Sequence, residues 1–176
     1  MARKPTIFKF GINLSVIDEN KYLDLNLTVA QHPSETVERM MVRVLAYCLN
    51  VDDGLEFTRG LGSTQDPDLW QHSLDGRLLK WIEVGEPAVE RLLKSNHTAD
   101  TVIVYCFNTK SDVWWEQSEQ EITRAGIKVY RFDWVEICTL ASLVSRTLQL
   151  SVTISGMSAF ISAESGSTEI SWQELS

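Results

Sequence analysis

The sequence lacks the features that mark several large protein classes. It has no stretch of the about 18 apolar residues that a membrane-spanning helix needs, and no apolar run with a cleavage site follows its N-terminus. We therefore expect a cytoplasmic protein without membrane contact. Only three of its 176 residues are cysteines, and they stand far apart among apolar neighbours. This spacing favours reduced core thiols over disulfides or a metal site; the residues are Cys48, Cys106 and Cys138.

Common catalytic signatures are also missing. The sequence has no Gly-x-Ser-x-Gly motif, which argues against a serine hydrolase. Its three histidines, His32, His72 and His97, do not have metal-ligand spacing, which argues against a zinc protease. The glycines of residues 59–62 lack the strand–loop–helix context of a phosphate-binding loop. The sequence contains no cofactor-binding motif that would indicate an enzyme acting on small molecules.

The balance of charge is acidic. Sixteen basic and twenty-four acidic residues give a formal net charge of −8, which argues against a general polyanion binder. A local basic cleft is still compatible with this balance, because nucleic-acid affinity depends on where lysines and arginines lie. The apolar share of 44% is ordinary for a globular protein.

Hydrophobic periodicity predicts one α/β (α+β) domain over residues 1–176. Strict alternation predicts an antiparallel hairpin from the N-terminal residues and further strands near the C-terminus. We expect a mixed central sheet with flanking helices at about 33–135, and an added antiparallel β layer from about 5–30 and 147–173. The predicted strands are 7–16, 22–29, 55–58, 78–84, 101–107, 127–132, 148–154, 159–163 and 169–172, the helices 33–50, 87–95, 112–125 and 134–145, and a loop covers 59–71.

Two acidic residues stand where strand ends are expected. Asp68 follows Pro67 at the entry to a loop and hairpin, and Glu83 closes a buried strand fifteen residues later. Carboxylates on adjacent strand ends, with the carbonyl of Val84 beside one of them, are ligands that Mg²⁺ or Mn²⁺ accepts. A metal in such a site polarises a scissile phosphate and lowers the pKa of the attacking water.

This pattern resembles the PD-(D/E)XK nuclease superfamily, in which an acidic helix precedes a meander that carries Asp and then Glu-x-Lys. The resemblance implies a restriction-endonuclease-like core with Asp68 and Glu83 as metal ligands and catalytic residues, and Glu35 or Glu38 as the additional acid. Gly85 stands where the pattern has Lys. We expect Lys94, and in second place Arg91, to supply that charge from the following helix, because three residues separate them on one helix face.

A narrower resemblance covers essentially the whole chain. Five segments together are similar to the bacterial YaeQ family: residues 32–36, 38–41, 57–61, 81–87 and the Trp114-Trp115 pair. Membership implies a PD-(D/E)XK-fold variant with an added β layer. The family has also been loosely associated with transcription elongation, which makes the transcription machinery an alternative partner.

Each of these residues also has an ordinary structural interpretation. Asp68 can form or cap a turn, and Glu83 can be a strand-end residue in solvent. Helical spacing predicts a surface ion pair of Glu90 with Lys94, and it also lets Glu35 pair with Arg39 along the first helix. Most tryptophans stand in periodic apolar segments and are expected in the core, namely Trp81, Trp114 and Trp134.

Two functional hypotheses follow from these residues. The first is a magnesium-dependent nuclease that hydrolyses phosphodiesters of nucleic acid. The second is a non-catalytic module that keeps the nuclease fold and binds nucleic acid or a protein. A basic cleft around the two carboxylates would favour nucleic acid; its candidate residues are Arg59, Trp70, Arg77 and Lys80. The sequence leaves the oligomeric state open.

Overall fold

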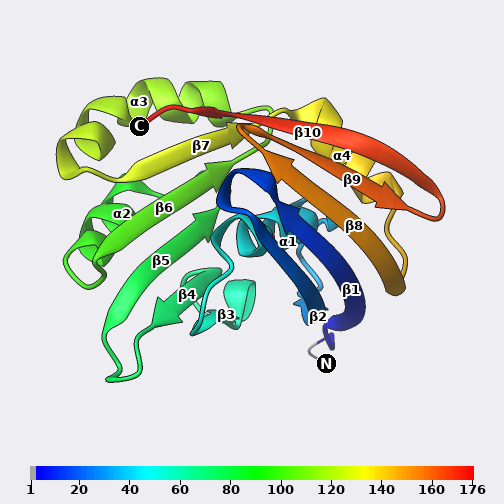
Figure 1. Cartoon of the computed structure of the whole chain (residues 1–176). Helices are drawn as coiled ribbons and strands as arrows, with labels where there is room; N and C mark the ends of the chain where they lie inside the picture. The colour runs from blue at the N-terminus through cyan, green and yellow to red at the C-terminus, as the bar shows by residue number, and fades with distance from the viewer. Residues whose placement is uncertain (1–2) are drawn as a thin grey trace. The chain divides into compact units, whose positions relative to one another are not determined.

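The computed structural model describes residues 3–176, which fold as a mixed α+β protein, as predicted (Figure 1). The chain divides into two compact units. Unit 1 joins the two terminal regions, residues 1–41 and 133–172, and unit 2 comprises residues 42–132 and 173–176. Within residues 3–176, every helix is too short or too polar to cross a bilayer.

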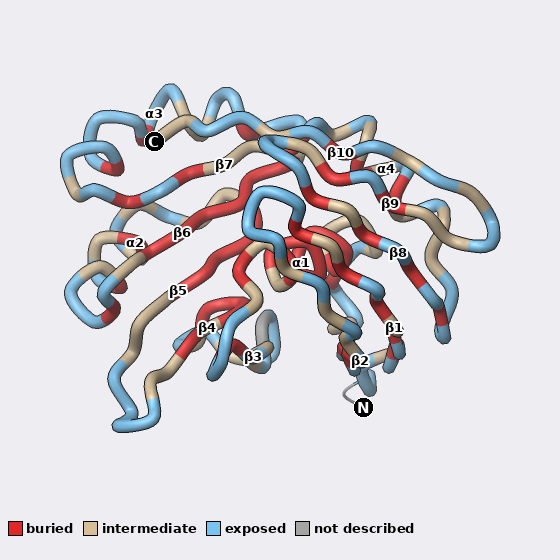
Figure 2. Tube along the Cα trace, viewed as in Figure 1, coloured by how far each residue is buried: buried red, intermediate tan, exposed pale blue. Residues whose placement is uncertain are grey.

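Unit 1 is built on strands from both ends of the chain. Strand order is β2-β1-β8-β9-β10, and helix α4 follows the point at which the chain enters the unit again. Apolar and polar residues alternate along β1 and β8, and Figure 2 shows the matching alternation of buried and exposed positions. The bounds are β1 Thr6–Val16, β2 Lys21–Gln31, α4 Trp134–Ser142, β8 Thr147–Ser155, β9 Ser158–Ala163 and β10 Gly166–Glu174, with a short helix η1 at Ile17–Glu19.

The predicted hairpin is confirmed, because β1 and β2 pair antiparallel over their full length. The prediction of a purely antiparallel layer is wrong at one strand pair. β1 and β8 run parallel, with Phe10 opposite Leu148. These two strands come from opposite ends of the chain, so no hairpin turn imposes an antiparallel direction on them.

Unit 2 has strand order β7-β6-β5-β4-β3. β5, β6 and β7 are parallel, and β3, β4 and β5 form an antiparallel meander. Helices α2 and α3 follow β5 and β6, and their apolar residues join those of β6 and β7 in one buried cluster. The bounds are α1 Val37–Asn50, β3 Leu55–Phe57, η2 Gly60–Gly62, β4 Leu69–His72, β5 Leu78–Val84, α2 Val89–Asn96, β6 Thr101–Cys106, α3 Ser111–Ala125 and β7 Lys128–Phe132.

Two differences from the predicted elements in this region exceed two residues. Strand β4 lies in the segment predicted as a loop, because its four residues are too few to show a period against the polar loop before it. Helix α1 begins at Val37 rather than near Pro33, because residues 32–35 form a turn closed by the bond from Glu35 N to His32 O. Most of α1 belongs to unit 2, since the division falls between Met41 and Val42.

Candidate active site

Two buried carboxylates of unit 2 lie side by side, Asp68 immediately before β4 and Glu83 on β5. Leu69 on β4 pairs with Ile82 on β5, so the next residues outward, Asp68 and Glu83, point to the same face of the sheet. Asp68 is 3% exposed and Glu83 6% exposed. Because burial of a carboxylate is costly unless it is paired or coordinated, this pair requires compensating contacts.

Backbone groups fix Asp68 at the start of β4. Its Oδ2 accepts a 2.8 Å hydrogen bond from the backbone N–H of Val84. Its own N–H donates to Ile82 O at 3.0 Å, and its carbonyl accepts from Thr58 N at 3.2 Å. The Asp68 carboxylate is thereby held against the end of β5, next to Glu83.

Two side chains from different elements hold Glu83. Its Oε1 accepts a bond from the indole Nε1 of Trp81 at 2.9 Å and one from Arg91 Nε at 2.6 Å. Burial raises the pKa of Glu83 above its ordinary value; the bond from Trp81 and the charge of Arg91 oppose that shift, and the charge of Asp68 adds to it. Both hydrogen bonds that the structure gives Glu83 reach the same oxygen, which leaves Oε2 as a ligand for a cation.

Arg91 connects Glu83 to the loop before β4. Its Nη1 donates to Thr64 O at 2.5 Å and its Nη2 to Asp66 O at 2.7 Å. The guanidinium also lies over the Trp81 ring, 5.9 Å from the ring centre. One helix residue thus joins β5, the indole and the loop of residues 58–67, an arrangement that we call the Arg91 clamp.

A pocket of about 500 Å³ opens beside the clamp. Lys94, one turn further along α2, lines it together with Trp81 and Arg91. Neither Asp68 nor Glu83 lines this pocket, and the bond from Arg91 to Glu83 is what connects it to the carboxylate pair. The remaining lining residues are Thr64, Gln65, Glu90, Ser95 and Thr98.

The chemistry of the carboxylate pair fits Mg²⁺ or Mn²⁺. Among residues 3–176 no three His, Cys, Asp or Glu side chains gather as a metal site. A metal at this point would have two carboxylate ligands, Asp68 and Glu83, and the carbonyl of Val84. Mg²⁺ binds through one or two carboxylates and keeps several waters, so this donor set is sufficient for it.

Comparison with known proteins places the whole chain in one family. The sequence profile described as YaeQ protein matches residues 1–172. This chain belongs to the YaeQ family. It is 35% identical to the "Uncharacterized protein YaeQ" of Salmonella typhi and 34% identical to that of Escherichia coli K12, with full coverage of both partners in each comparison. The resemblance of the sequence to the YaeQ family is thus confirmed.

Two solved structures of YaeQ proteins show the same fold. The protein from Xanthomonas axonopodis pv. citri superposes with a TM-score of 0.92 at 31% identity, over 97% of each chain. The protein from Pseudomonas syringae gives a TM-score of 0.93 at 33% identity, over 98% of this chain and 96% of the other.

Of the two cationic candidates in this YaeQ-family chain, Arg91 contacts Glu83 and Lys94 is an exposed residue of the pocket. Helical spacing places both on one face of α2 and does not distinguish them. Trp81 was expected in the core, and it is 9% exposed, but its indole N–H also holds Glu83. The i, i+2 spacing of Trp81 and Glu83 on a strand was the signal that could have revealed this contact.

Gly85, at the position where the resemblance to the nuclease pattern would place a lysine, has an unusual backbone conformation. Its φ is +104°, a backbone conformation that residues other than glycine rarely adopt. Its N–H still donates to Tyr105 O at 2.9 Å, so the chain leaves β5 at this residue while remaining bonded to β6. A lysine would be strained at this position, and α2 brings a cation to Glu83 instead.

The candidate cleft residues do not all gather at the carboxylates. Arg77 lies at the other end of β5, about 20 Å along the strand from Glu83, where it pairs with Asp100 at 2.8 Å. Lys80 is three residues from Glu83, so its side chain is on the opposite face of the strand.

The other two cleft candidates lie nearer to the clamp. Trp70 is opposite Trp81, and its indole N–H donates to Glu56 Oε1 at 2.8 Å. Arg59 is an exposed residue of the clamped loop.

The two additional acids, Glu35 and Glu38, belong to unit 1 and are described within it. Glu35 is buried and pairs with Arg39 at 2.9 Å, which confirms the ion pair expected from their spacing. Glu38 lies in the first turn of α1, and its charge adds to desolvation in raising the pKa of the Cys138 thiol.

Proposed function

We propose that this chain is a metal-dependent nuclease with a PD-(D/E)XK-like core in unit 2. The observation that carries the proposal is the pair of buried carboxylates, Asp68 and Glu83, with Arg91 bonded to the second. The order of elements supports it, because a helix precedes a meander that carries both acids, and a helix and a parallel strand follow.

Asp68, Glu83 and the carbonyl of Val84 would hold Mg²⁺ or Mn²⁺. When bound, such a metal polarises a phosphodiester and makes water a stronger nucleophile. The protein prepares the ligands. The Val84 N–H orients the Asp68 carboxylate, while Trp81 and Arg91 favour the ionised form of Glu83 against its burial.

Arg91 and Lys94 would bind the phosphate. Both line one pocket, from which Arg91 also bonds to Glu83, and developing negative charge on a phosphate is stabilised by cations already in position. Arg91 would then exchange a contact with Glu83 or with the loop for one with phosphate. The pocket volume of about 500 Å³ is sufficient for one nucleotide beside the cations. The Trp81 ring is part of the pocket wall.

A second candidate function is a binding module without turnover. The ion pair of 2.6 Å between Arg91 and Glu83 favours it, because this contact already neutralises one of the metal ligands. The module would bind nucleic acid or a protein of the transcription machinery through the same pocket.

Metal titration separates the two functions. Mg²⁺ and Mn²⁺ are titrated by calorimetry into the wild type and into an Asp68→Asn, Glu83→Gln double variant, in the presence and absence of a DNA duplex. Nuclease assays on single- and double-stranded DNA and RNA follow. We expect saturable binding, and metal-dependent cleavage, in the wild type alone. Lys80→Gln is the matched control, because Lys80 lies on the same strand but faces away from Glu83.

Metal binding that survives in the double variant would refute the proposed ligands. The absence of metal binding with and without nucleic acid would refute the nuclease and leave the binding module. Retained nucleic-acid binding without cleavage in any metal would support that module directly.

A further inference from the structure

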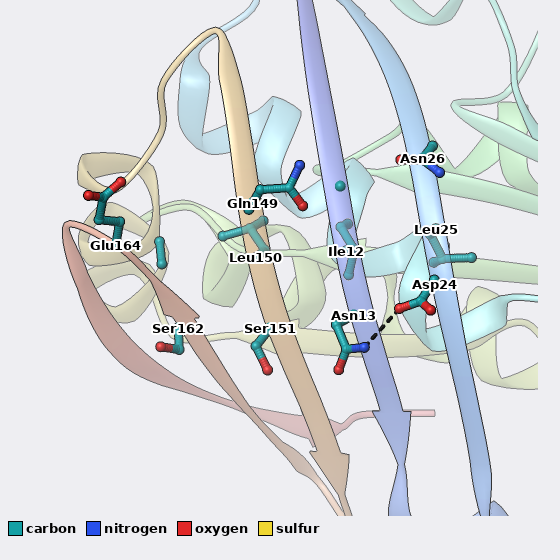
Figure 3. Close-up of a pocket in the computed structure, with 12 residues that line it drawn as sticks. Ile12, Asn13, Asp24, Leu25, Asn26, Gln149, Leu150, Ser151, Ser162 and Glu164 are labelled. Atoms are coloured by element: carbon teal, nitrogen blue, oxygen red, sulfur yellow. Dashed lines mark hydrogen bonds between the residues drawn. The ribbon is translucent and has the colours of Figure 1, made fainter.

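A hollow of about 490 Å³ lies on the outer face of the unit 1 sheet (Figure 3). Its size is that of a site for a small ligand. The side chains that line it on this face are polar, and most of them are uncharged. They come from β1, β2, β8 and β9: Asn13, Asp24, Asn26, Gln149, Ser151 and Ser162.

Strand register brings these side chains into two parallel rows. In the first row, Asp24, Asn13, Ser151 and Ser162 are neighbours on successive strands. In the second row, Asn26 and Gln149 flank Gly11 on either side. Paired residues point to the same face, so the polar groups converge over a surface three to four strands wide.

Gly11 provides the floor of the hollow. The carboxamide of Gln149 lies across this glycine, and a Cβ added at position 11 would be 2.3 Å from Gln149 Oε1. Any side chain on Gly11 would therefore displace the carboxamide that Figure 3 shows extending from β8 toward β1. The glycine thus gives Gln149 its position in the hollow.

Most of these groups are available to a ligand. Asn13 Nδ2 donates to Asp24 Oδ1 at 2.8 Å, which orients both side chains. Within residues 3–176, the carboxamides of Asn26 and Gln149 have no hydrogen bond to another residue, and the hydroxyls of Ser151 and Ser162 have none either. Each carboxamide offers donors and an acceptor side by side, which matches a pair of neighbouring hydroxyls.

The charge of this face excludes an anionic ligand. Only Lys9 and Asp24 are charged among the outward residues of β1, β2 and β8, and no lysine or arginine lines the hollow. Asp24 and Glu164 both line it and would repel phosphate or sulfate. The partner suited to these groups is neutral and rich in hydroxyls.

Exposed aromatic side chains stand one row away from the hollow. Tyr22, Ser15, Thr153 and Phe160 form the next row on the same face. Tyr22 is 63% exposed and Phe160 51% exposed. Tyr22 and Phe160 are three strands apart across the sheet, which corresponds to about 14 Å. Rings that are exposed beside a polar surface can stack on the apolar faces of sugar rings whose hydroxyls bind elsewhere.

We propose that the outer face of unit 1 binds a neutral oligosaccharide. The carboxamides of Asn26 and Gln149, the Asn13–Asp24 pair and the two serines bind sugar hydroxyls, while Tyr22 and Phe160 stack on flanking rings. This site is independent of the carboxylates of unit 2.

The test begins with an array of neutral oligosaccharides built from glucose, mannose, galactose and N-acetylglucosamine, beside sialylated and sulfated ones. The neutral trisaccharide that binds most strongly is then titrated by calorimetry. We expect at least tenfold weaker binding in Asn26→Ala, Gln149→Ala and Phe160→Ser. Gly11→Ala should weaken binding similarly, since its methyl group displaces the Gln149 carboxamide. Thr147→Ala, on β8 outside the hollow, should bind like the wild type.

Three outcomes would overturn the proposal. They are no binding of any neutral glycan at millimolar concentration, binding of the anionic glycans only, and binding that the hollow variants leave unchanged. The oligomeric state is measured for each variant, because a face that joins two copies of the chain would show a shift in mass instead of weaker glycan binding.

Discussion

At the scale of single residues, the candidate site depends on how each charge is compensated. Glu83 is buried, and its neighbours only partly offset the cost of ionising it, so its pKa stays above the ordinary value. A metal or a substrate would change this balance directly. The protonation of Glu83 therefore reports on the state of the site.

The free energy of unfolding should depend on pH through the ionisation of Glu83. Because its folded-state pKa is raised, Glu83 favours folding below the ordinary glutamate pKa, and this contribution is lost as the pH rises through the raised value. As the pH rises from the ordinary glutamate pKa through the raised pKa of Glu83, the free energy of unfolding of the wild type should therefore fall. We expect a smaller fall in Glu83→Gln, which has no carboxyl group to ionise at this position. Urea denaturation at successive pH values measures the difference. Parallel pH profiles for the two proteins would contradict the expectation.

Gly85 gives a second prediction at this scale. The substitution Gly85→Lys should destabilise the fold by about 1–2 kcal/mol, because the backbone there has positive φ. The space around the position is open, so the cost is one of backbone conformation rather than collision. Gly85→Ala should show the same loss in thermal unfolding. A lysine variant as stable as the wild type would refute this explanation.

At the scale of elements, the clamp makes the loop of residues 58–67 depend on α2. Two of the three hydrogen bonds of the Arg91 guanidinium reach carbonyls of this loop. Hydrogen bonds from a charged donor contribute about 1.5–3 kcal/mol each. The loop should therefore open more readily once the guanidinium is replaced.

Arg91→Lys should speed amide hydrogen exchange in the loop by about tenfold or more, because one ammonium cannot reach Glu83 and both carbonyls. The amide of Gly62, bonded to Arg59 O, is a suitable probe. Exchange in β1 and β2 should not change. Lys94→Ala, on the same helix, is the control and should leave the loop protected. Equal exchange rates in both variants would show that the clamp does not hold the loop.

Most helices and strands of this chain could be predicted because their apolar residues recur with a clear helical or strand period. The alternation in residues 7–16 and 22–29 marks two strands, and the turn between them fixes their pairing. The parallel pairing of β1 with β8 could not be predicted, since alternation identifies a strand but not its partner. Asp68 and Glu83 could be named from a resemblance, while the choice of Arg91 over Lys94 depends on a rotation of α2 that no spacing reveals.

At the scale of the whole molecule, each of the two units combines segments that are far apart in the sequence. Unit 2 is continuous from Val42 to Phe132 but also includes the last four residues. There, Leu175 N donates to Val129 O at 2.8 Å, and Val129 N donates to Ser176 O at 2.9 Å. Leu175 also packs against the buried cluster of this unit.

Removal of residues 173–176 should therefore destabilise unit 2 by about 2–4 kcal/mol, through lost backbone hydrogen bonds of about 1 kcal/mol each and the exposure of apolar surface. Urea denaturation of the truncated and full chains measures this. Glu174→Ala, which leaves these backbone bonds in place, should unfold near the wild-type midpoint. An unchanged midpoint after truncation would mean that the terminal segment is not part of the stable core.

The contacts of the Arg91 clamp have a consequence for how this surface can change during evolution or engineering. Arg91 binds the main-chain oxygens of Thr64 and Asp66, and every amino acid has such an oxygen. The side chains at positions 64–66 can therefore be exchanged while the loop keeps its anchor beside the pocket. A library randomised at these three positions should yield folded variants with altered ligand preference, in the way that antibody loops vary on a constant framework.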